Sequence, residues 1–353
     1  MGQTLVIAEK PSVAGDIARA LGGFKKDGDF WVSDAMIVGS AVGHLLEIKA
    51  PEEYDVKRGR WSFANLPVLP PHFDLQPIKK SIKKFEGLEK KIRSRSVTDI
   101  INACDAGREG ELIFRYIIQA TGTKKPIRRL WLQSMTKASI QKAFTALRSD
   151  AEMKPLEAAA RSRSEADWLV GINGTRALTA FNSKDGGFFL TTVGRVQTPT
   201  LAIVVAREEE ITHFKPQNYW EVHATFGAQA GDYDSVWVDA DFKKTKGQSA
   251  ELKPERLWTA AEAQAIVAKC QGKLGIVTDH KRRATSAPPA LFDLTSLQRE
   301  ANGRFGFPAK MTLAILQRLY ERHKVLTYPR TDSRALPEDY PETMKETLSH
   351  LQK

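Results

Sequence analysis

Short apolar runs alternate with segments of helical spacing along the first part of the chain. Residues 4–8, 36–42, 97–103 and 127–132 are rich in Val, Ile and Leu, which is typical of buried strands. Between and after these runs, apolar residues recur three or four positions apart, as on one face of a helix. This alternation predicts a Rossmann-like α/β domain over residues 1–152.

The hydrophobic pattern changes after that domain. A long helix is predicted at 155–183, where strong helix formers occur without strand alternation. The elements predicted further on are strands at 219–226, 233–240 and 273–280 and helices at 260–270, 294–305 and 308–322. We therefore expect a multidomain α/β plus α+β fold, with further domains at 153–215, 216–286 and 287–353.

Composition narrows the class of partner. The 353 residues carry a formal net charge of +11, which favours a polyanion such as a nucleic acid, with an anionic membrane surface as the alternative. No stretch approaches the roughly 18 apolar residues of a membrane span, and no signal-peptide pattern precedes the first strand. The two cysteines, Cys104 and Cys270, lack zinc-site spacing and fit a reducing compartment. We expect a soluble, cytoplasmic protein.

Carboxylates follow two of the predicted strands directly. The strand at 97–103 ends before Asp105, and Glu109 lies about one helical turn later. Glu9 follows the strand at 4–8, with Lys10 beside it. Ligands of open α/β sheets bind at the carboxyl ends of strands, and carboxylate oxygens suit Mg²⁺. The alternative is structural: Asp105 caps a helix and Glu109 favours its positive end.

A second chemical motif lies near the end of the chain, at Tyr328-Pro329-Arg330. A residue before proline is extended, so Tyr328 and Arg330 tend to project to the same side. Nearby cations would help to ionise the phenol and would stabilise charge on an attacked phosphate. An exposed turn is the alternative interpretation of this tripeptide taken alone.

Other stretches have the composition of nucleic-acid contacts. Trp168 and Arg176 lie about two turns apart on the predicted long helix, so they share a face that could stack on a base and hold a phosphate. Trp61, beside Arg58 and Arg60, has the same combination. Packing inside the protein is the alternative for both tryptophans.

A predicted helix start supplies a further phosphate cradle, made of backbone N–H groups and polar side chains. Its residues are Thr192, Val193, Gly194, Arg195, Val196 and Gln197. A structural turn is the alternative. Residues 79–95 are dense in Lys and Arg at helical spacing, which indicates a helix with a solvated basic face. No Gly-x-x-x-x-Gly-Lys-Ser/Thr loop occurs, which disfavours an ATP-driven motor.

These motifs together resemble one family. The segments that carry the resemblance are LVIAEKPSVAGDIARAL, VGHLLEI, ACDAGREGELIF, GRVQTPTLA and TYPRTDSRALP. Occurring in this order over nearly the whole chain, they resemble type IA DNA topoisomerases, more specifically the bacterial topoisomerase III group. The resemblance implies a Toprim domain at 1–152, a single-strand groove helix within 153–215, the first part of a linking domain at 216–286 and a tyrosine-bearing domain at 287–353, an incomplete toroid.

The resemblance also implies a reaction. Tyr328 would attack a phosphodiester of single-stranded DNA, forming a 5′-phosphotyrosine bond and freeing a 3′-hydroxyl that later reverses the step. Arg330 would stabilise the transition state, and Lys10 would protonate the leaving oxygen. This requires the phenol to dock against the acidic edge of the first domain.

The implied cofactor is Mg²⁺, held by Glu9, Asp105 and Glu109. The family usually has a further acid where this chain has Gly107, so we expect a weaker site. His44 would contact substrate or phosphate, with a structural role as the alternative. The residues implied to grip the strand are Trp61, Trp168, Arg176 and residues 192–197.

The implied substrate is single-stranded DNA within underwound or catenated duplex, with no nucleotide fuel and with a helicase or a single-strand-binding protein as a possible partner. A Toprim nuclease or primase would share the acids but would not need the Tyr-Pro-Arg motif. A non-catalytic single-strand-binding protein would explain the charge but not the acids. Family members continue past the tyrosine motif, so the chain is expected to be a fragment or a shortened form.

Overall fold

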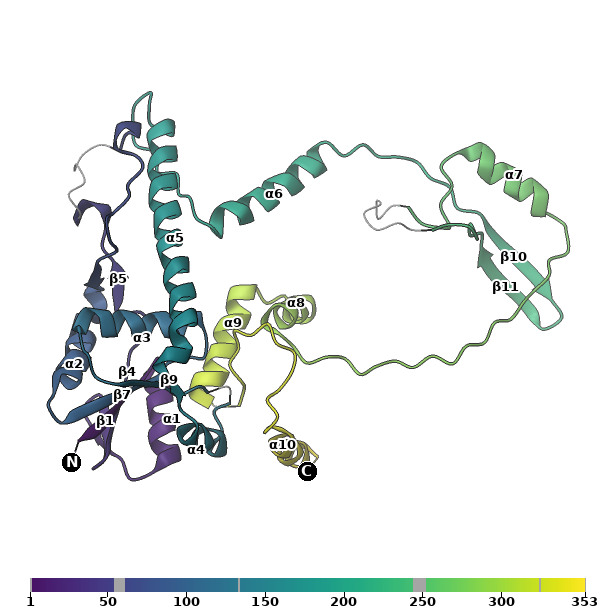
Figure 1. The fold of residues 1–353 in the computed structure, drawn as a ribbon. Helices are drawn as coiled ribbons and strands as arrows, with labels where there is room; N and C mark the ends of the chain where they lie inside the picture. Colours follow the sequence, from purple (N-terminus) through teal and green to yellow (C-terminus); the bar gives the residue numbers. More distant parts are fainter. Residues whose placement is uncertain (1, 54–60, 133, 244–251, 324, 353) are drawn as a thin grey trace. The chain divides into compact units, whose positions relative to one another are not determined.

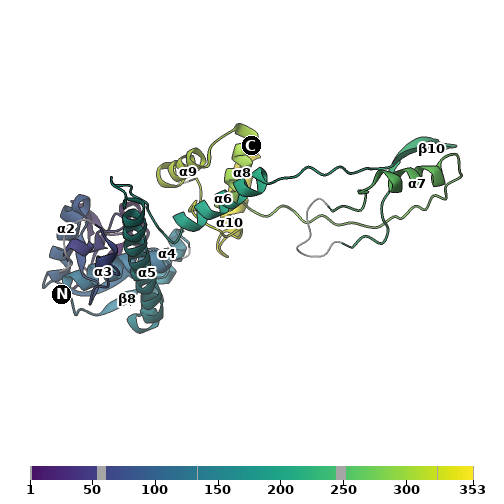
Figure 2. The same ribbon diagram turned by 90° about the horizontal axis from the view of Figure 1, so that it is seen from above.

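The computed structural model describes residues 2–53, 61–132, 134–243, 252–323 and 325–352. Contacts within the chain divide it into two compact units. Unit 1 comprises Met1–Pro199 and Pro288–Lys353, and unit 2 comprises Thr200–Ala287. Figure 1 and Figure 2 show the elements of each unit from two directions.

A seven-stranded sheet forms the core of unit 1. In spatial order its strands are β2 (Lys25–Asp27), β3 (Phe30–Val32), β4 (Met36–Ser40), β1 (Gln3–Ala8), β7 (Val97–Ala103), β8 (Ile127–Arg129) and β9 (Arg148–Ser149). The four central strands, from β4 to β8, are parallel. Along β1, Leu5 and Ile7 join one hydrophobic cluster while Val6 and Ala8 join another, so both faces of the sheet are covered.

Four helices that precede residue 150 contribute apolar side chains to these two clusters. They are α1 (Pro11–Leu21), α2 (Ile82–Arg93), α3 (Arg108–Thr121) and α4 (Lys137–Thr145). Ile17 of α1 and Ile140 of α4 share the cluster of Val6, whereas Leu88 of α2 and Phe114 of α3 share that of Leu5. The predicted α/β character of this part of the chain is confirmed.

The segment between β4 and α2 contains a small antiparallel pair of strands. Its elements are β5 (Leu46–Ile48), η1 (Pro51–Glu53), η2 (Phe63–Asn65), β6 (Leu75–Pro77) and the 3-10 turn η3 (Lys79–Ser81). β5 and β6 pair antiparallel. These two strands therefore form a second sheet, separate from the seven-stranded one.

The predicted long helix is α5 (Asp150–Asn182), which begins five residues before the predicted start. A capping box explains the earlier start, because Ser149 accepts a hydrogen bond from the Glu152 N–H and the Glu152 carboxylate accepts one from the Ser149 N–H. α5 packs along α3, and the Tyr116 hydroxyl bonds Ser164 at 2.9 Å.

The C-terminal part of unit 1 is helical, as predicted. Its elements are α8 (Leu294–Phe305), α9 (Ala309–Arg318), the π-helical turn η4 (Leu319–His323) and α10 (Pro341–Leu351). Asp293 caps α8 and also pairs with Arg334 at 3.1 Å, which ties the segment after the tyrosine motif to this helix.

Unit 2 contains α6 (Gln197–Thr212), which begins at its boundary, an antiparallel pair β10 (His223–Ala228) and β11 (Gly231–Val236), and α7 (Ala260–Cys270). The strand predicted at 273–280 is wrong: these residues form no strand, and Leu274 and Ile276 are fully exposed. An alternating pattern needs a neighbouring strand to pair with, and the described residues offer none here. No described helix has the length and apolar character to cross a membrane.

Candidate active site

Parallel strands bring two of the predicted acids together. Ala8 at the end of β1 is paired in register with Ala103 at the end of β7, so Glu9 and Asp105 follow at the same edge of the sheet. The Lys10 ammonium lies between them, 3.6 Å from Glu9 Oε1 and 3.8 Å from Asp105 Oδ2. Adjacent parallel strands thus build an acid–lysine cluster, defined as Glu9, Lys10 and Asp105.

Burial and mutual repulsion set the protonation of this cluster. The Glu9 side chain is buried, and burial followed by the charge of Asp105 raises the pKa of its carboxyl group. Burial disfavours the charged form of Lys10, yet Asp105, Tyr328 and Glu9 together raise its pKa. The ammonium is therefore the stable form of Lys10 at neutral pH.

One oxygen of the cluster is unsatisfied. Glu9 Oε2 is buried without a hydrogen-bond partner among the described residues. An unpartnered carboxylate oxygen beside a second carboxylate suits a hard cation such as Mg²⁺. Glu9 and Asp105 thus fit a metal, although Lys10 already supplies part of the neutralising charge.

Glu109 does not join the other two acids. Its exposed carboxylate bonds His44 Nε2 at 2.5 Å, and no group of three His, Cys, Asp or Glu residues in the described part of the chain is arranged to hold a metal ion. The α3 backbone instead packs tightly on Asp105, because a Cβ at Gly110 would lie 2.3 Å from the Asp105 carbonyl oxygen. The structure therefore assembles two ligands of the predicted three.

A buried arginine that is not among the predicted site residues holds the backbone at Asp105. The Arg129 guanidinium donates hydrogen bonds to the carbonyl oxygens of Cys104 at 2.6 Å and Asp105 at 2.7 Å. Its side chain is 1% exposed and also approaches Glu111, which is fully buried. In the sequence, the indication of this role is an arginine within an apolar strand, because burying its charge costs free energy unless the charge is paired.

The tyrosine of the C-terminal motif lies against the acid–lysine cluster. Lys10 Nζ is 5.0 Å from the centroid of the Tyr328 ring, and Tyr320 packs edge-on against the same ring at 5.5 Å. The Tyr328 side chain is half exposed, and Pro329 behind it is buried. Arg330 is exposed and forms no ion pair with the described residues. The phenol and the acids, far apart in sequence, thus share one site.

A second contact, also unexpected from the sequence, holds the tyrosine-bearing segment to the α/β domain. Asp339 Oδ2 accepts hydrogen bonds from Ser134 at 2.8 Å and from Thr136 at 2.7 Å. Burial disfavours the Asp339 carboxylate, but these two hydrogen bonds outweigh that effect and lower its pKa. We call this contact the Asp339 clasp.

The predicted strand-gripping residues of α5 are engaged inside unit 1. The Trp168 indole donates to the Lys49 carbonyl oxygen at 3.2 Å. Arg176 is buried, pairs with Glu52 and lies 5.2 Å over the Trp61 ring. Arg58 and Arg60, expected beside Trp61, lie outside the described residues. The predicted aromatic and cationic groups meet one another in this structure.

The predicted phosphate cradle is partly occupied by internal bonds. The Val193 N–H donates to Thr175 Oγ1 at 2.9 Å and the Gly194 N–H to Thr198 Oγ1 at 3.1 Å. Arg195 pairs with Asp167. The side chains left exposed are those of Thr192, Arg195, Val196 and Gln197.

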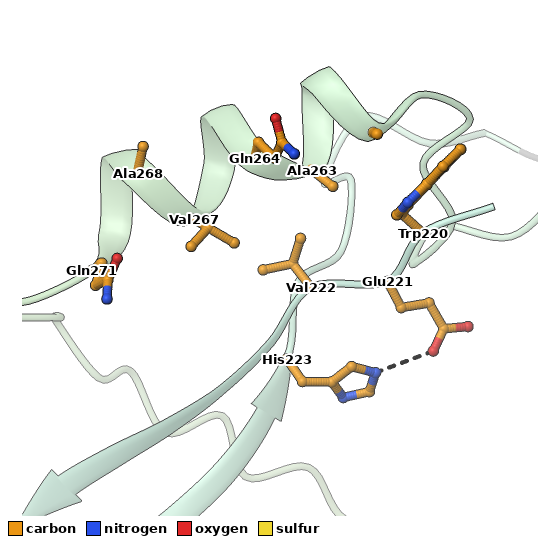
Figure 3. A pocket seen from close by; sticks show the side chains of 10 residues that line it. Trp220, Glu221, Val222, His223, Ala263, Gln264, Val267, Ala268 and Gln271 are labelled. Carbon is orange, nitrogen blue, oxygen red and sulfur yellow. Dashed lines mark hydrogen bonds and ion pairs between the residues drawn. The ribbon is translucent and has the colours of Figure 1, made fainter.

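Unit 2 contains a cavity of its own, of about 400 Å³, between α7 and the start of β10. Figure 3 shows Val222 and Val267 facing each other across it and His223 bonded to Glu221 at 3.2 Å. None of the predicted site residues lines this cavity.

The fold and site define a class: a Toprim-type α/β domain whose acidic sheet edge receives a tyrosine from a helical unit. Family models agree, since a Toprim domain model matches residues 4–135 and a DNA topoisomerase model matches residues 151–353. The chain belongs to the type IA DNA topoisomerase family.

Relatives extend this similarity over the whole chain. DNA topoisomerase 3 of Bacillus licheniformis and that of Bacillus subtilis are each 41% identical over 354 residues, covering 100% of this chain and 46% of the relative. That of Shouchella clausii is 43% identical over 351 residues. The chain thus spans about half the length of these relatives.

A solved structure shares the fold. Full-length topoisomerase I from Thermotoga maritima matches with a TM-score of 0.60 and 23% identity, covering 98% of this chain and 52% of that one. This likeness supports the multidomain α/β plus α+β fold predicted from the sequence.

Proposed function

We propose that this chain cleaves and rejoins single-stranded DNA through a transient bond to Tyr328. Family membership supports the class of reaction, and one observation supports its residues: the Lys10 ammonium lies both beside the Tyr328 ring and between two carboxylates. Each step exchanges one phosphoester for another, so the reaction needs no nucleotide fuel.

In the proposed step, the Tyr328 hydroxyl loses its proton to solvent, and the resulting phenolate oxygen attacks a backbone phosphorus and forms a phosphotyrosine bond as the bond to the 3′-oxygen breaks. Lys10 donates a proton to that leaving oxygen, and Arg330 stabilises the charge of the pentavalent transition state. The freed 3′-hydroxyl later attacks the same phosphorus, returns its proton to Lys10 and releases the Tyr328 phenolate, which regains a proton from solvent.

Mg²⁺ is the proposed cofactor, with Glu9 and Asp105 as its ligands. When bound, the cation would neutralise the two carboxylates and hold a DNA phosphate near them. Glu109 could join them only after its bond to His44 breaks. Gly107 adds no ligand, although a Cβ there would meet nothing within 4 Å.

The finer assignments complete the proposal. The strand is gripped by residues 192–197, and by Trp61, Trp168 and Arg176 once their internal contacts open. The substrate is a single-stranded region of underwound or catenated duplex, encountered in the cytoplasm at the nucleoid, with a helicase or a single-strand-binding protein as partner. The domain limits predicted from the sequence belong to the same proposal.

Trapping tests this proposal. A single strand labelled at its 3′ end should stay attached to the protein under denaturing conditions, because the 5′-phosphate of the downstream fragment is bound. Tyr328→Phe should abolish the adduct and leave binding intact. Tyr320→Phe is the matched control, since it removes the hydroxyl of the neighbouring tyrosine and should retain the adduct. Cleavage that survives Tyr328→Phe would support a Toprim nuclease, and binding by the unaltered chain without an adduct would support a binding protein.

A further inference from the structure

We propose that the outer side of α2 binds the phosphate backbone of duplex DNA. We call this surface the α2 lysine face and define it as Lys83 and Lys90 of α2 with Lys79 and Lys80 of the preceding turn η3. The inference deepens the proposed function by assigning a place for the duplex that flanks the single-stranded target. α2 lies on the outer rim of the α/β domain in both views (Figure 1, Figure 2).

The cations of α2 and of the turn before it fall into two sets, and the first set has acidic partners; in this set Arg93 pairs with Glu89 of the same helix at 2.9 Å. Lys84 pairs with Asp29 at 3.0 Å and Lys91 pairs with Asp27 at 4.0 Å. Both ammonium groups also lie over the Phe30 ring, at 6.0 and 5.1 Å from its centroid. These two lysines, seven positions apart on one side of α2, anchor it to the hairpin of β2 and β3.

The second set has no such partners. Lys79, Lys80, Lys83 and Lys90 are exposed and form no ion pair or hydrogen bond within the described part of the chain. Lys79 and Lys80 lie in the 3-10 turn η3 and precede Lys83 of α2, so like charges gather near the start of the helix, where the helix dipole disfavours cations. Glu86 is an exposed acid on this side, three positions after Lys83 and four before Lys90. The four lysines therefore leave an excess of positive charge there, while Lys84 and Lys91 are neutralised.

A glycine interrupts the same side of the helix. Gly87 lies four residues after Lys83 and three before Lys90, so the three residues share a face. A Cβ there would meet nothing within 4 Å, so packing does not require glycine. Glycine weakens a helix interior, but it lets another backbone approach closely. Charge repulsion and this glycine both disfavour the helix by itself, and a bound polyanion would offset the repulsion.

The chemistry of the face favours a duplex over a single strand. Single-strand binding surfaces use aromatic side chains on which bases stack, and the aromatic residue of α2, Phe85, is buried in the core. Lysines alone contact phosphates without reading sequence, and a duplex carries twice the charge density of one strand.

Duplex affinity and its salt dependence test the assignment. The 353-residue chain and a variant with all four lysines of the face changed to Gln are titrated with a 30-base-pair blunt duplex over a range of salt concentrations. Because each phosphate contact contributes about 0.9 to the slope of log affinity against log salt, the slope should fall by about 3 to 4. Affinity at low salt should drop on the order of 100-fold. The corresponding Lys→Arg variant should bind as the unaltered chain does.

The control removes the same charge elsewhere. Its exposed lysines, changed to Gln together, are Lys124, Lys137, Lys310 and Lys345. An equal loss of duplex affinity in this control, or a loss of binding to vesicles containing anionic lipid with duplex binding unchanged, would overturn the proposal. The Tyr328 adduct on a short single strand should be unchanged in the α2 variant. Absence of the adduct in the unaltered chain would contradict only the proposed function, and the duplex titration would still decide whether the α2 lysine face binds DNA.

Discussion

The acidic edge of the sheet and the helix α5 both contain residues expected to meet DNA, but they differ in the partners of their polar groups. At the sheet edge, Glu9 keeps a buried oxygen without a partner and Asp105 lies beside it. On α5, Arg176 pairs with Glu52, although its Nε is buried without a partner among the described residues, and Asp167 pairs with Arg195 of the following loop. A buried carboxylate oxygen without a partner suits a cation, whereas the paired side chains of α5 must exchange partners to bind DNA.

The largest effect should come from the sheet edge. Lys10→Ala removes the proposed proton donor, so adduct formation should slow by about 10²- to 10⁴-fold, the usual range for a general acid. The rate is measured by quenching with denaturant at successive times. Lys26→Ala is the control, because this lysine lies on β2 away from the cluster. A loss below tenfold would remove Lys10 from the chemistry.

The Asp339 clasp should matter next. Asp339→Ala removes two hydrogen bonds to a charged group, and we expect adduct formation to fall about tenfold as the tyrosine-bearing segment loosens. Glu346→Ala on α10 should leave the rate unchanged. Because the folded state lowers the pKa of Asp339, its stabilising effect is fully present above its ordinary value of 3.8 and is lost as pH falls through the folded pKa. The difference in Tm between variant and unaltered chain should therefore be constant from neutral pH to about pH 5 and vanish in stronger acid.

A smaller effect should appear in stability without DNA. Glu9 has a raised pKa, so its ionised form destabilises the folded state, increasingly as pH rises above its ordinary value of 4.5. Glu9→Gln should raise Tm at pH 7 by about 2 to 4 °C and give no gain below that pKa. Added Mg²⁺ should raise the Tm of the unaltered chain more than that of the variant. Glu86→Gln serves as the exposed control, and equal Mg²⁺ shifts would argue against Glu9 as a ligand.

The smallest effect should come from the α5 side. Asp167→Asn frees Arg195 from an exposed ion pair that water screens and weakens, so single-strand affinity should rise by up to about fivefold. Fluorescence anisotropy with a labelled oligonucleotide measures the change, and Asp185→Asn tests for a general charge effect. A decrease in affinity would mean that the strand does not compete for Arg195.

Sequence patterns predicted that Glu9 and Asp105 lie at one edge of the sheet, because the local pattern shows where each strand ends. Each acid directly follows an apolar run, and the carboxyl ends of parallel strands meet at one edge. The position of Tyr328 came from family resemblance, since no local pattern specifies which distant segment it contacts.

Side-chain partners chosen by tertiary packing could not be predicted. His44 and Glu109 are 65 positions apart, and Asp339 and Ser134 are 205 apart, so neither pair leaves a periodic signal. The strand predicted at 273–280 failed for the opposite reason: its pattern is present, but the described residues provide no neighbouring strand.

The central claim is that the Tyr328 hydroxyl beside the acid–lysine cluster supplies the oxygen that becomes bonded to DNA. Digesting the trapped adduct and sequencing its DNA-bearing peptide by mass spectrometry tests this most directly. We expect a 5′-phosphate carried on Tyr328 and on no other residue. A nucleotide attached elsewhere, or a cleaved strand with no attached peptide, would contradict it.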